Sequence, residues 1–348
     1  MPKQAASANA ASSIDAEILY EAIVAGERRA LARAITLVES TRPDHRRAAR
    51  SLLARISAAP RASIRIGISG SPGVGKSTFI EAFGGHVIEQ GHKLAVLAVD
   101  PSSELSGGSV LGDKTRMETL SKHPHAFVRP SPAGLTLGGV TRRTREAIRL
   151  CEAAGYDVVI VETVGVGQSE TAVAGMTDLF MLLLQPGGGD ELQGMKRGIM
   201  ELADVVLISK ADGDLQAAAG QAAADYGNAL RLLRPRVSGW AVPVEICSAL
   251  NGTGIAEAWG HVEQFRRRFT ENGWIAVRRA EQAKQWMWAE IRESLTASLS
   301  DDETVKSRLK ELEAAVVNGE AAAGDAAQEI VSLFLDSDRR GAKPRGRS

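Results

Sequence analysis

A glycine-rich octapeptide lies between two different hydrophobic patterns, and this arrangement limits the possible folds sharply. The peptide fits G-x-x-x-x-G-K-[ST] and is followed by Thr78; its residues are Gly70, Ser71, Pro72, Gly73, Val74, Gly75, Lys76 and Ser77. Residues 64–69 alternate as a strand does, and residues 78–89 follow the period of a helix. A strand, a glycine loop and a helix N-terminus together allow backbone N–H groups to surround a phosphate.

This context predicts a phosphate loop, with the residues from Gly70 to Thr78 as nucleotide contacts. Glycines are required because a Cβ atom would keep the backbone away from the anion. We expect Lys76 to reach the β- and γ-phosphates and the Ser77 hydroxyl to ligate Mg²⁺. The alternative is a glycine-rich turn that matches by accident, and the flanking strand and helix argue against it.

Composition excludes several classes of protein. The 348 residues carry 42 basic and 42 acidic side chains. This balance argues against a general nucleic-acid or membrane-surface binder, although it does not exclude a local patch of charge. Cys151 and Cys247 lie far apart in apolar stretches, so we expect buried thiols without a disulfide, in a cytoplasmic protein. No apolar run is long enough to span a bilayer, and the first 13 residues lack the apolar region of a secretory signal.

The chain divides into five expected regions. We expect a disordered tail, a helical extension, a nucleotide-binding domain, a helical C-terminal arm and a basic flexible tail, at residues 1–13, 14–60, 61–272, 273–337 and 338–348. Within the nucleotide-binding domain, Val/Ile/Leu-rich runs alternate with helical stretches, as in a buried parallel sheet. After the strand at 64–69, the strand candidates are residues 94–99, 158–161, 179–184, 205–209 and 242–247.

The connection after the phosphate loop separates two kinds of α/β nucleotide-binding fold. Its helix turns at residues 90–92 directly into the strand at 93–99, and a strand reached through a helical crossover is parallel to the first one. We therefore predict a mostly parallel P-loop NTPase sheet flanked by helices. This is the branch of signal-recognition and nickel-insertion GTPases rather than the Ras-like branch.

Acidic residues follow two of these strands, where ligands of parallel sheets bind. Asp100 ends the second strand and is predicted to act on Mg²⁺ directly or through water, with helix capping as the alternative. The polar loop at 104–116 is a candidate switch region, in which Asp113 adds a second carboxylate. Glu162 and Gly165 occupy the positions of D-x-x-G, where the acid holds a magnesium-bound water and the glycine N–H senses the γ-phosphate.

Hydrolysis is expected to be slow without a partner. Val166 stands where Ras-type enzymes keep a glutamine that positions water, and a valine can neither orient nor activate water. Gln168 is nearby, but its spacing from Gly165 differs from that of the water-positioning glutamine of Ras-type enzymes.

Two segments predict guanine as the base. Ser209, Lys210 and Asp212 match N-K-x-D except for the serine, and the Asp212 carboxylate can accept both N1–H and N2–H of guanine. Ser248, Ala249 and Leu250 follow another strand, as the loop that contacts guanine O6 does. Two further motifs are not expected to be sites: His123-Pro124-His125 is predicted as a surface turn, and residues 187–189 as a hinge.

Longer motifs closely resemble the methylmalonyl-CoA mutase-associated GTPase chaperones. They are the segments at 100–103, 109–117, 162–170 and 189–196, and the likeness extends from about Leu31 to Trp288. The resemblance implies a homodimeric G protein that binds GTP or GDP with Mg²⁺. Such a protein associates with an adenosylcobalamin-dependent acyl-CoA mutase, gates loading of its cofactor and protects it from inactivation.

The resemblance also assigns roles to residues. Lys76, Asp100, Asp113, Glu162 and Lys196 are the implied catalytic positions, the last of them in a switch loop at 185–196. The implied metal positions are Ser77, Asp100, Asp113 and Glu162. The C-terminal helices would form the dimer arm. Ser209 departs from the family's usual asparagine, and Gly188 from its frequent alanine.

Two other functions remain to be compared. A kinase or transport-associated ATPase would prefer ATP, and Asp212 argues against it. A metallochaperone would need a Cys/His cluster, which the sequence lacks.

Overall fold

A computed structural model of the chain describes residues 15–58, 61–99, 117–130, 137–163, 169–186 and 197–341. Its centre is a seven-stranded sheet with the order β3-β2-β4-β1-β5-β6-β7, in which every pair of neighbouring strands is parallel. The strands are β1 Ile64–Gly70, β2 Leu94–Val99, β3 Ala126–Arg129, β4 Val158–Thr163, β5 Leu179–Leu184, β6 Val205–Ile208 and β7 Val244–Ile246. The predicted parallel α/β fold is confirmed.

The central strands form where the sequence has unbroken apolar runs. All six residues of β5 are buried, because helices cover both faces of the sheet at this strand. The edge strand β3 was not among the strands predicted from the sequence. It has only four residues, of which two are buried, and so short a segment contains no apolar run long enough to predict a strand.

Helices cover the two faces of the sheet. On one face the apolar side chains of the sheet share a core cluster with α4 Lys76–Glu89, α7 Glu118–Lys122 and α13 Ile255–Glu271. On the other face lie α8 Leu137–Ala153, α9 Ser169–Ala174, α11 Arg197–Met200 and α12 Gln216–Arg231, the last preceded by the short 3₁₀ helix η1 Gly213–Leu215. The carboxyl ends of all seven strands therefore meet at one edge of a covered sheet.

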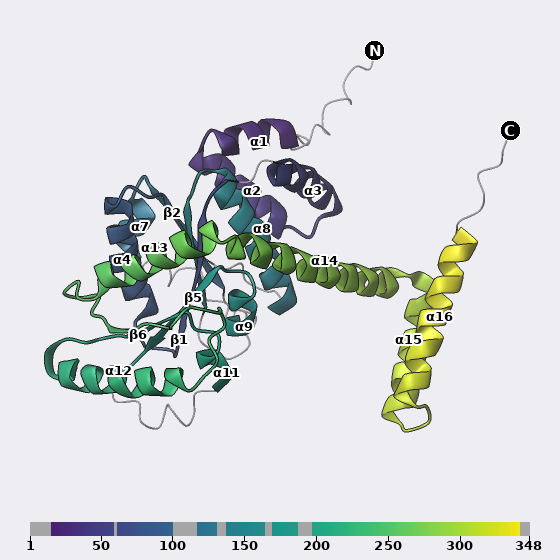
Figure 1. Ribbon diagram of the computed structural model, residues 1–348. Coiled ribbons are helices and arrows are strands. Elements are labelled where there is room, and N and C mark those ends of the chain that lie inside the picture. Colours follow the sequence, from purple (N-terminus) through teal and green to yellow (C-terminus); the bar gives the residue numbers. More distant parts are fainter. Residues whose placement is uncertain are drawn as a thin grey trace, which may run out of the picture. The chain divides into compact units, whose positions relative to one another are not determined.

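Three N-terminal helices pack against α8 (Figure 1). They are α1 Ala16–Val24, α2 Arg28–Glu39 and α3 Pro43–Ala58. An ion pair between Arg129 and Glu39 joins the end of β3 to the end of α2. Arg28 donates to the carbonyls of Ser121 (2.8 Å) and His123 (3.2 Å), so α2 also holds the end of α7.

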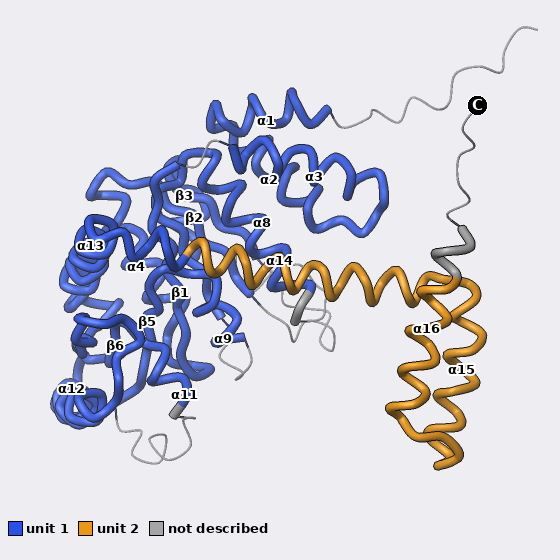
Figure 2. Tube along the Cα trace, turned by 45° about the vertical axis from the view of Figure 1, so that its right-hand side comes forward, with its two compact units in different colours: residues 1–278 blue, residues 279–348 orange. Residues whose placement is uncertain are grey.

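The chain divides into two compact units, residues 1–278 and 279–348 (Figure 2). Helix α14 Trp274–Asp301 begins in the first unit and continues into the second, which also contains α15 Glu303–Val317 and α16 Ala323–Gly341. The last two helices form a hairpin around Val305, Leu312 and Ile330. Asp302 caps α15 by accepting the N–H groups of Thr304 and Val305. Among the residues described, no helix combines the length and apolarity needed to cross a membrane.

Candidate nucleotide site

The phosphate loop joins the end of β1 to the start of α4. Gly70 allows close packing, since a Cβ atom there would lie 2.4 Å from the carbonyl oxygen of Leu183 on β5. Gly73 and Gly75 have φ angles of 81° and 98°, in the left-handed region that side chains disfavour. Because Gly75 is the N-cap of α4 and has no side chain, no side chain caps the first N–H groups of this helix. The predicted phosphate site requires N–H groups that are left uncapped in this way.

Lys76 is buried at the base of this loop. Its ammonium group donates to the carbonyl oxygens of Gly70 at 2.7 Å and Ser71 at 3.1 Å. Burial lowers the pKa of Lys76, while the negative charges of Glu162 and Glu170 raise it. The lysine thus lies in a partly desolvated position, where its attraction to phosphate oxygens is strong.

Glu162 is placed by the register of the sheet. It is paired with Ile68 of β1, two residues before the phosphate loop, and is partly buried. The next residue, Thr163, donates from its hydroxyl to that of Ser69 at 2.8 Å, and both are buried. This bond ties the carboxyl end of β4 to that of β1. Glu162 therefore lies on the strand adjacent to the phosphate loop.

Ser209 holds the phosphate loop from the other side. Its buried hydroxyl lies 2.8 Å from the carbonyl oxygen of Val74 and 3.0 Å from that of Leu184. A hydroxyl has one proton, so it donates to one of these carbonyls at a time. Lys210 follows with a φ of 56°, the one positive value of a non-glycine residue in the described part of the chain. Its Cε lies 4.0 Å from the Cβ position of Gly75, so its stem lies beside the phosphate loop.

Asp212 and Ser248 form a hydrogen-bonded pair. The Ser248 hydroxyl, fully buried after β7, donates to Oδ2 of Asp212 at 2.5 Å. A backbone bond of 3.0 Å from Ala211 N–H to the carbonyl of Cys247 joins the same two segments. Asp212 precedes η1 but makes no capping bond to it. Its carboxylate is therefore oriented by Ser248 and is not used by the local helix.

Some of the other predicted site residues are described by the structure, and some lie outside the described ranges. Ser77 is partly exposed and Thr78 exposed in the first turn of α4, while Ala249 is partly exposed and Leu250 is exposed beyond β7. Asp100, Asp113, Gly165, Lys196 and the segment 187–189 lie outside the described residues. His123 and His125 lie at a turn before β3, as predicted.

Glu170 is a residue to which the sequence assigned no role. It is buried in the first turn of α9 and acts electrostatically on Lys76. It lies eight positions after Glu162, and no periodic pattern marks it. Its position depends on how α9 packs against the sheet, so only the fold could reveal it.

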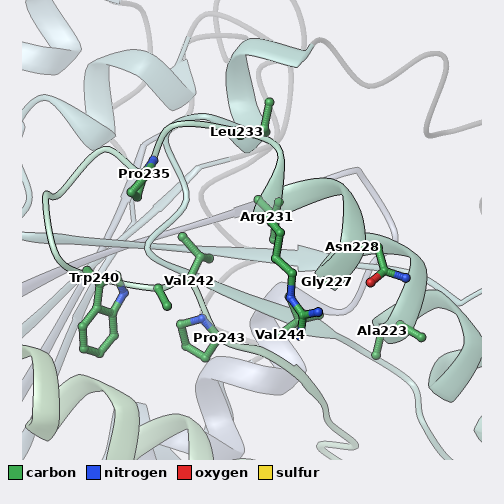
Figure 3. Close-up of a pocket in the computed structure, with 13 residues that line it drawn as sticks. Ala223, Gly227, Asn228, Arg231, Leu233, Pro235, Trp240, Val242, Pro243 and Val244 are labelled. Atoms are coloured by element: carbon green, nitrogen blue, oxygen red, sulfur yellow. The ribbon is translucent and has the colours of Figure 1, made fainter.

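A separate cavity of about 660 Å³ lies between α12 and the segment leading into β7 (Figure 3). Its lining includes Leu230, Arg231, Trp240 and Pro243 and none of the predicted nucleotide contacts. This hollow is distinct from the site at the carboxyl edge of the sheet.

A parallel sheet with a glycine phosphate loop, a buried lysine and an oriented aspartate at one edge defines a P-loop GTPase. The comparisons agree. The family described as "Methylmalonyl Co-A mutase-associated GTPase MeaB" matches residues 31–304, and the chain belongs to this family. It is a GTPase, and it binds guanine nucleotides.

Two curated relatives and one solved structure show how far the similarity extends. A "Putative GTPase" of Caulobacter vibrioides is 54% identical over 322 residues, covering 92% of this chain and 98% of that protein. The mouse "Methylmalonic aciduria type A homolog, mitochondrial" is 49% identical over 326 residues, covering 91% and 79%. A crystal structure titled "LAO/AO transport system kinase" aligns with a TM-score of 0.73 at 37% identity, covering 92% and 97%.

Proposed function

We propose that this GTPase is a chaperone of an adenosylcobalamin-dependent acyl-CoA mutase of the methylmalonyl-CoA mutase type. In this proposal it gates cofactor loading and protects or reactivates the mutase. Membership of a family named for its association with methylmalonyl-CoA mutase supports the client. The single observation that carries the nucleotide part is the Asp212 carboxylate, held by Ser248 in the same segment as Ser209, which contacts the phosphate loop.

The residues present fit a magnesium ion on the nucleotide. Ser77 offers a hydroxyl in the first turn of α4, and Glu162 a partly exposed carboxylate on the neighbouring strand. No group of three His, Cys, Asp or Glu side chains that could hold a metal occurs within the described ranges. Nucleotide-bound Mg²⁺ does not need one, because phosphates and waters supply most of its ligands. When bound, the ion would neutralise charge on the β- and γ-phosphates.

The chain's own groups then have separate tasks. Lys76 exchanges its bonds to the Gly70 and Ser71 carbonyls for phosphate oxygens. Glu162 would hold a water of the bound Mg²⁺, and Asp212 accepts N1–H and N2–H of guanine. Since Val166 offers no group to orient the attacking water, intrinsic hydrolysis is slow and the mutase supplies the stimulation. Asp100, Asp113 and Lys196 complete the proposed set by their positions in the family motifs.

Base selectivity tests the nucleotide assignment. We expect Asp212→Asn to lose affinity for GTP by at least about 100-fold and to gain affinity for XTP, because an amide can donate to the xanthine oxygen. Isothermal calorimetry with GTP, XTP and ATP measures the change, and Asp214→Asn on the exposed side of η1 serves as control. Unchanged GTP affinity in Asp212→Asn, or an ATP preference of the natural protein, would refute the assignment; the latter would favour a kinase or transport-associated ATPase.

The client is tested separately. Purified methylmalonyl-CoA mutase should be retained by the immobilised protein in a nucleotide-dependent manner and should accelerate GTP hydrolysis. A protein that hydrolyses GTP but neither binds nor responds to the mutase would leave the GTPase intact and remove the chaperone role.

A further inference from the structure

Helix α9 interacts with two residues of the first unit that are far apart in the sequence, Lys76 and Arg278. It comes after β4, which carries Glu162, and leads into β5. Its six residues span only about 9 Å. Ser169, Glu170, Val173 and Ala174 are buried, so both ends of the helix are packed against neighbours. A displacement at one end of such a short buried element is passed to the other.

The N-terminal end of α9 lies within electrostatic reach of Lys76. Glu170 acts on the charge of Lys76, as does Glu162. The body of the helix is pressed against β1 at Gly67, where a Cβ atom would lie 2.9 Å from Val173 and 2.9 Å from Thr177. Gly67 is three residues before the phosphate loop. The helix therefore contacts the strand that carries this loop.

The C-terminal end of α9 is held by two arginines. Arg278 donates to the carbonyl of Ala174 at 2.7 Å and to that of Thr177 at 3.3 Å. Arg236 donates to the same Ala174 carbonyl at 3.4 Å and to that of Asp178 at 3.0 Å. The last carbonyls of a helix have no partner within it, and cations near them are favourable.

The two arginines differ in what else holds them. Arg236 forms a two-pronged ion pair with the buried Asp204, which fixes its position. In the described part of the chain Arg278 forms no ion pair of its own; it contacts the ring of Trp274, 5.4 Å from the guanidinium carbon, and feels the charges of Asp204 and Asp178. Burial and the nearby Arg236 lower the pKa of Arg278 to about 10, which leaves it charged at neutral pH. Its hydrogen bonds therefore go to carbonyls at, and just beyond, the end of α9.

Arg278 lies in the second turn of α14, the helix that continues into the second unit. We propose that α9 transmits the nucleotide state from Lys76 to Arg278, and that Arg278 is the positioning residue through which α14 responds. When the nucleotide changes the groups around Lys76, α9 shifts, and the carbonyls of Ala174 and Thr177 move with it. Arg278 follows them and alters the first turns of α14. This inference rests on the proposed nucleotide switch.

Amide hydrogen exchange of the full chain tests the coupling. The probes are GDP and a non-hydrolysable GTP analogue, and the readout is exchange in residues 279–301 of α14. We expect exchange rates in the natural protein to differ between the two states by about threefold or more. In Arg278→Gln the difference should fall below about 1.5-fold, while both nucleotides bind within about threefold of the natural affinity. Arg278→Lys should be intermediate, because one ammonium spans the two carbonyls poorly.

The control is Arg267→Gln, an exposed arginine on α13, which should keep the full difference. Thermal melting checks that each variant is folded. If Arg278→Gln is unfolded, the exchange difference in Arg278→Lys tests the proposal instead. The proposal is overturned if Arg278→Gln retains the nucleotide-dependent exchange, if Arg267→Gln loses it equally, or if the natural protein binds both nucleotides without any difference in α14. Absence of guanine-nucleotide binding in calorimetry would instead remove the nucleotide site itself, and the coupling with it.

Discussion

At the scale of single residues, Ser209 departs from a motif and still contacts the predicted phosphate loop. The usual asparagine of N-K-x-D is absent, and the sequence alone leaves the effect on nucleotide binding open. In the structure the serine hydroxyl reaches the carbonyl of Val74, inside the phosphate loop. The segment proposed to select the base is thereby tied to the segment proposed to bind the phosphates.

Removal of this hydroxyl should weaken nucleotide binding without changing the choice of base. Ser209→Ala loses a buried hydrogen bond, worth about 1–2 kcal/mol, that holds the phosphate loop in shape, so we expect the affinity for GDP and GTP alike to fall by up to about 5–30-fold. Asp212 is unaltered, so discrimination against ATP should persist. Calorimetry with the three nucleotides measures both effects, with Ser307→Ala on an exposed position of α15 as control. An affinity equal to that of the natural protein would show that the tie has no energetic role.

The two thiols should be chemically inert in the folded state. Burial raises the pKa of Cys247 to about 12, and burial also raises that of Cys151. A raised pKa favours the folded state below the unfolded value of about 8.5, and this contribution is lost as pH rises toward the folded value. At pH 8 iodoacetamide should leave both cysteines unmodified until urea is added, as mass spectrometry would show. Rapid alkylation of the native protein would contradict their burial.

At the scale of elements, local sequence patterns predict the strands at the centre of the sheet. The apolar runs of β2 and β5 predict the observed bounds, residues 94–99 and 179–184. Strand β3 was missed because its short segment carries no alternation, and only pairing with β2 makes it a strand. The tight contact at Gly67 could not be predicted either, since it depends on α9 packing across the sheet.

A pair of glycine substitutions should separate this packing from backbone effects. A Cβ at Gly67 would lie 2.8 Å from Phe180 as well as close to α9, so Gly67→Ala should destabilise the protein by about 1–3 kcal/mol. Gly85, within α4, has nothing within 4 Å of its Cβ position. Gly85→Ala should therefore stabilise it by about 0.5–1 kcal/mol. Urea unfolding measures the free energy of unfolding of both variants. If Gly67→Ala is as stable as the natural protein, Phe180 and α9 must shift to make room for the extra methyl group.

At the scale of the whole molecule, the site is assembled by long-range contacts that no local pattern contains. Ser248 reaches Asp212 from 36 residues away, and Arg278 reaches Ala174 from 104 residues away. The sequence could name Lys76 and Asp212 because each lies in a short motif. It could not name Glu170 or Arg278, because the contacts behind their proposed roles form only when α9 and the first residues of α14 pack in the first unit.

The second unit exposes an apolar stripe of its own. On α14 the side chains of Trp288, Ile291 and Leu295 recur at helical spacing, and the first and last are 51% and 58% exposed. The hairpin of α15 and α16 buries a separate cluster around Val305 and Leu312. We expect a second copy of the chain to cover the stripe, because exposed apolar faces of this kind favour self-association through matching surfaces.

Two serine substitutions test this expectation. Ile291→Ser combined with Leu295→Ser removes apolar area from the stripe, and each buried side chain contributes about 1.5–3 kcal/mol. The natural protein should elute as a dimer at micromolar concentration in size-exclusion chromatography with light scattering, and the double variant as a monomer. Val317→Ser, at an 85% exposed position at the end of α15, should leave the dimer intact. A dimeric double variant would place the interface elsewhere, and a monomeric natural protein would leave the stripe for another partner.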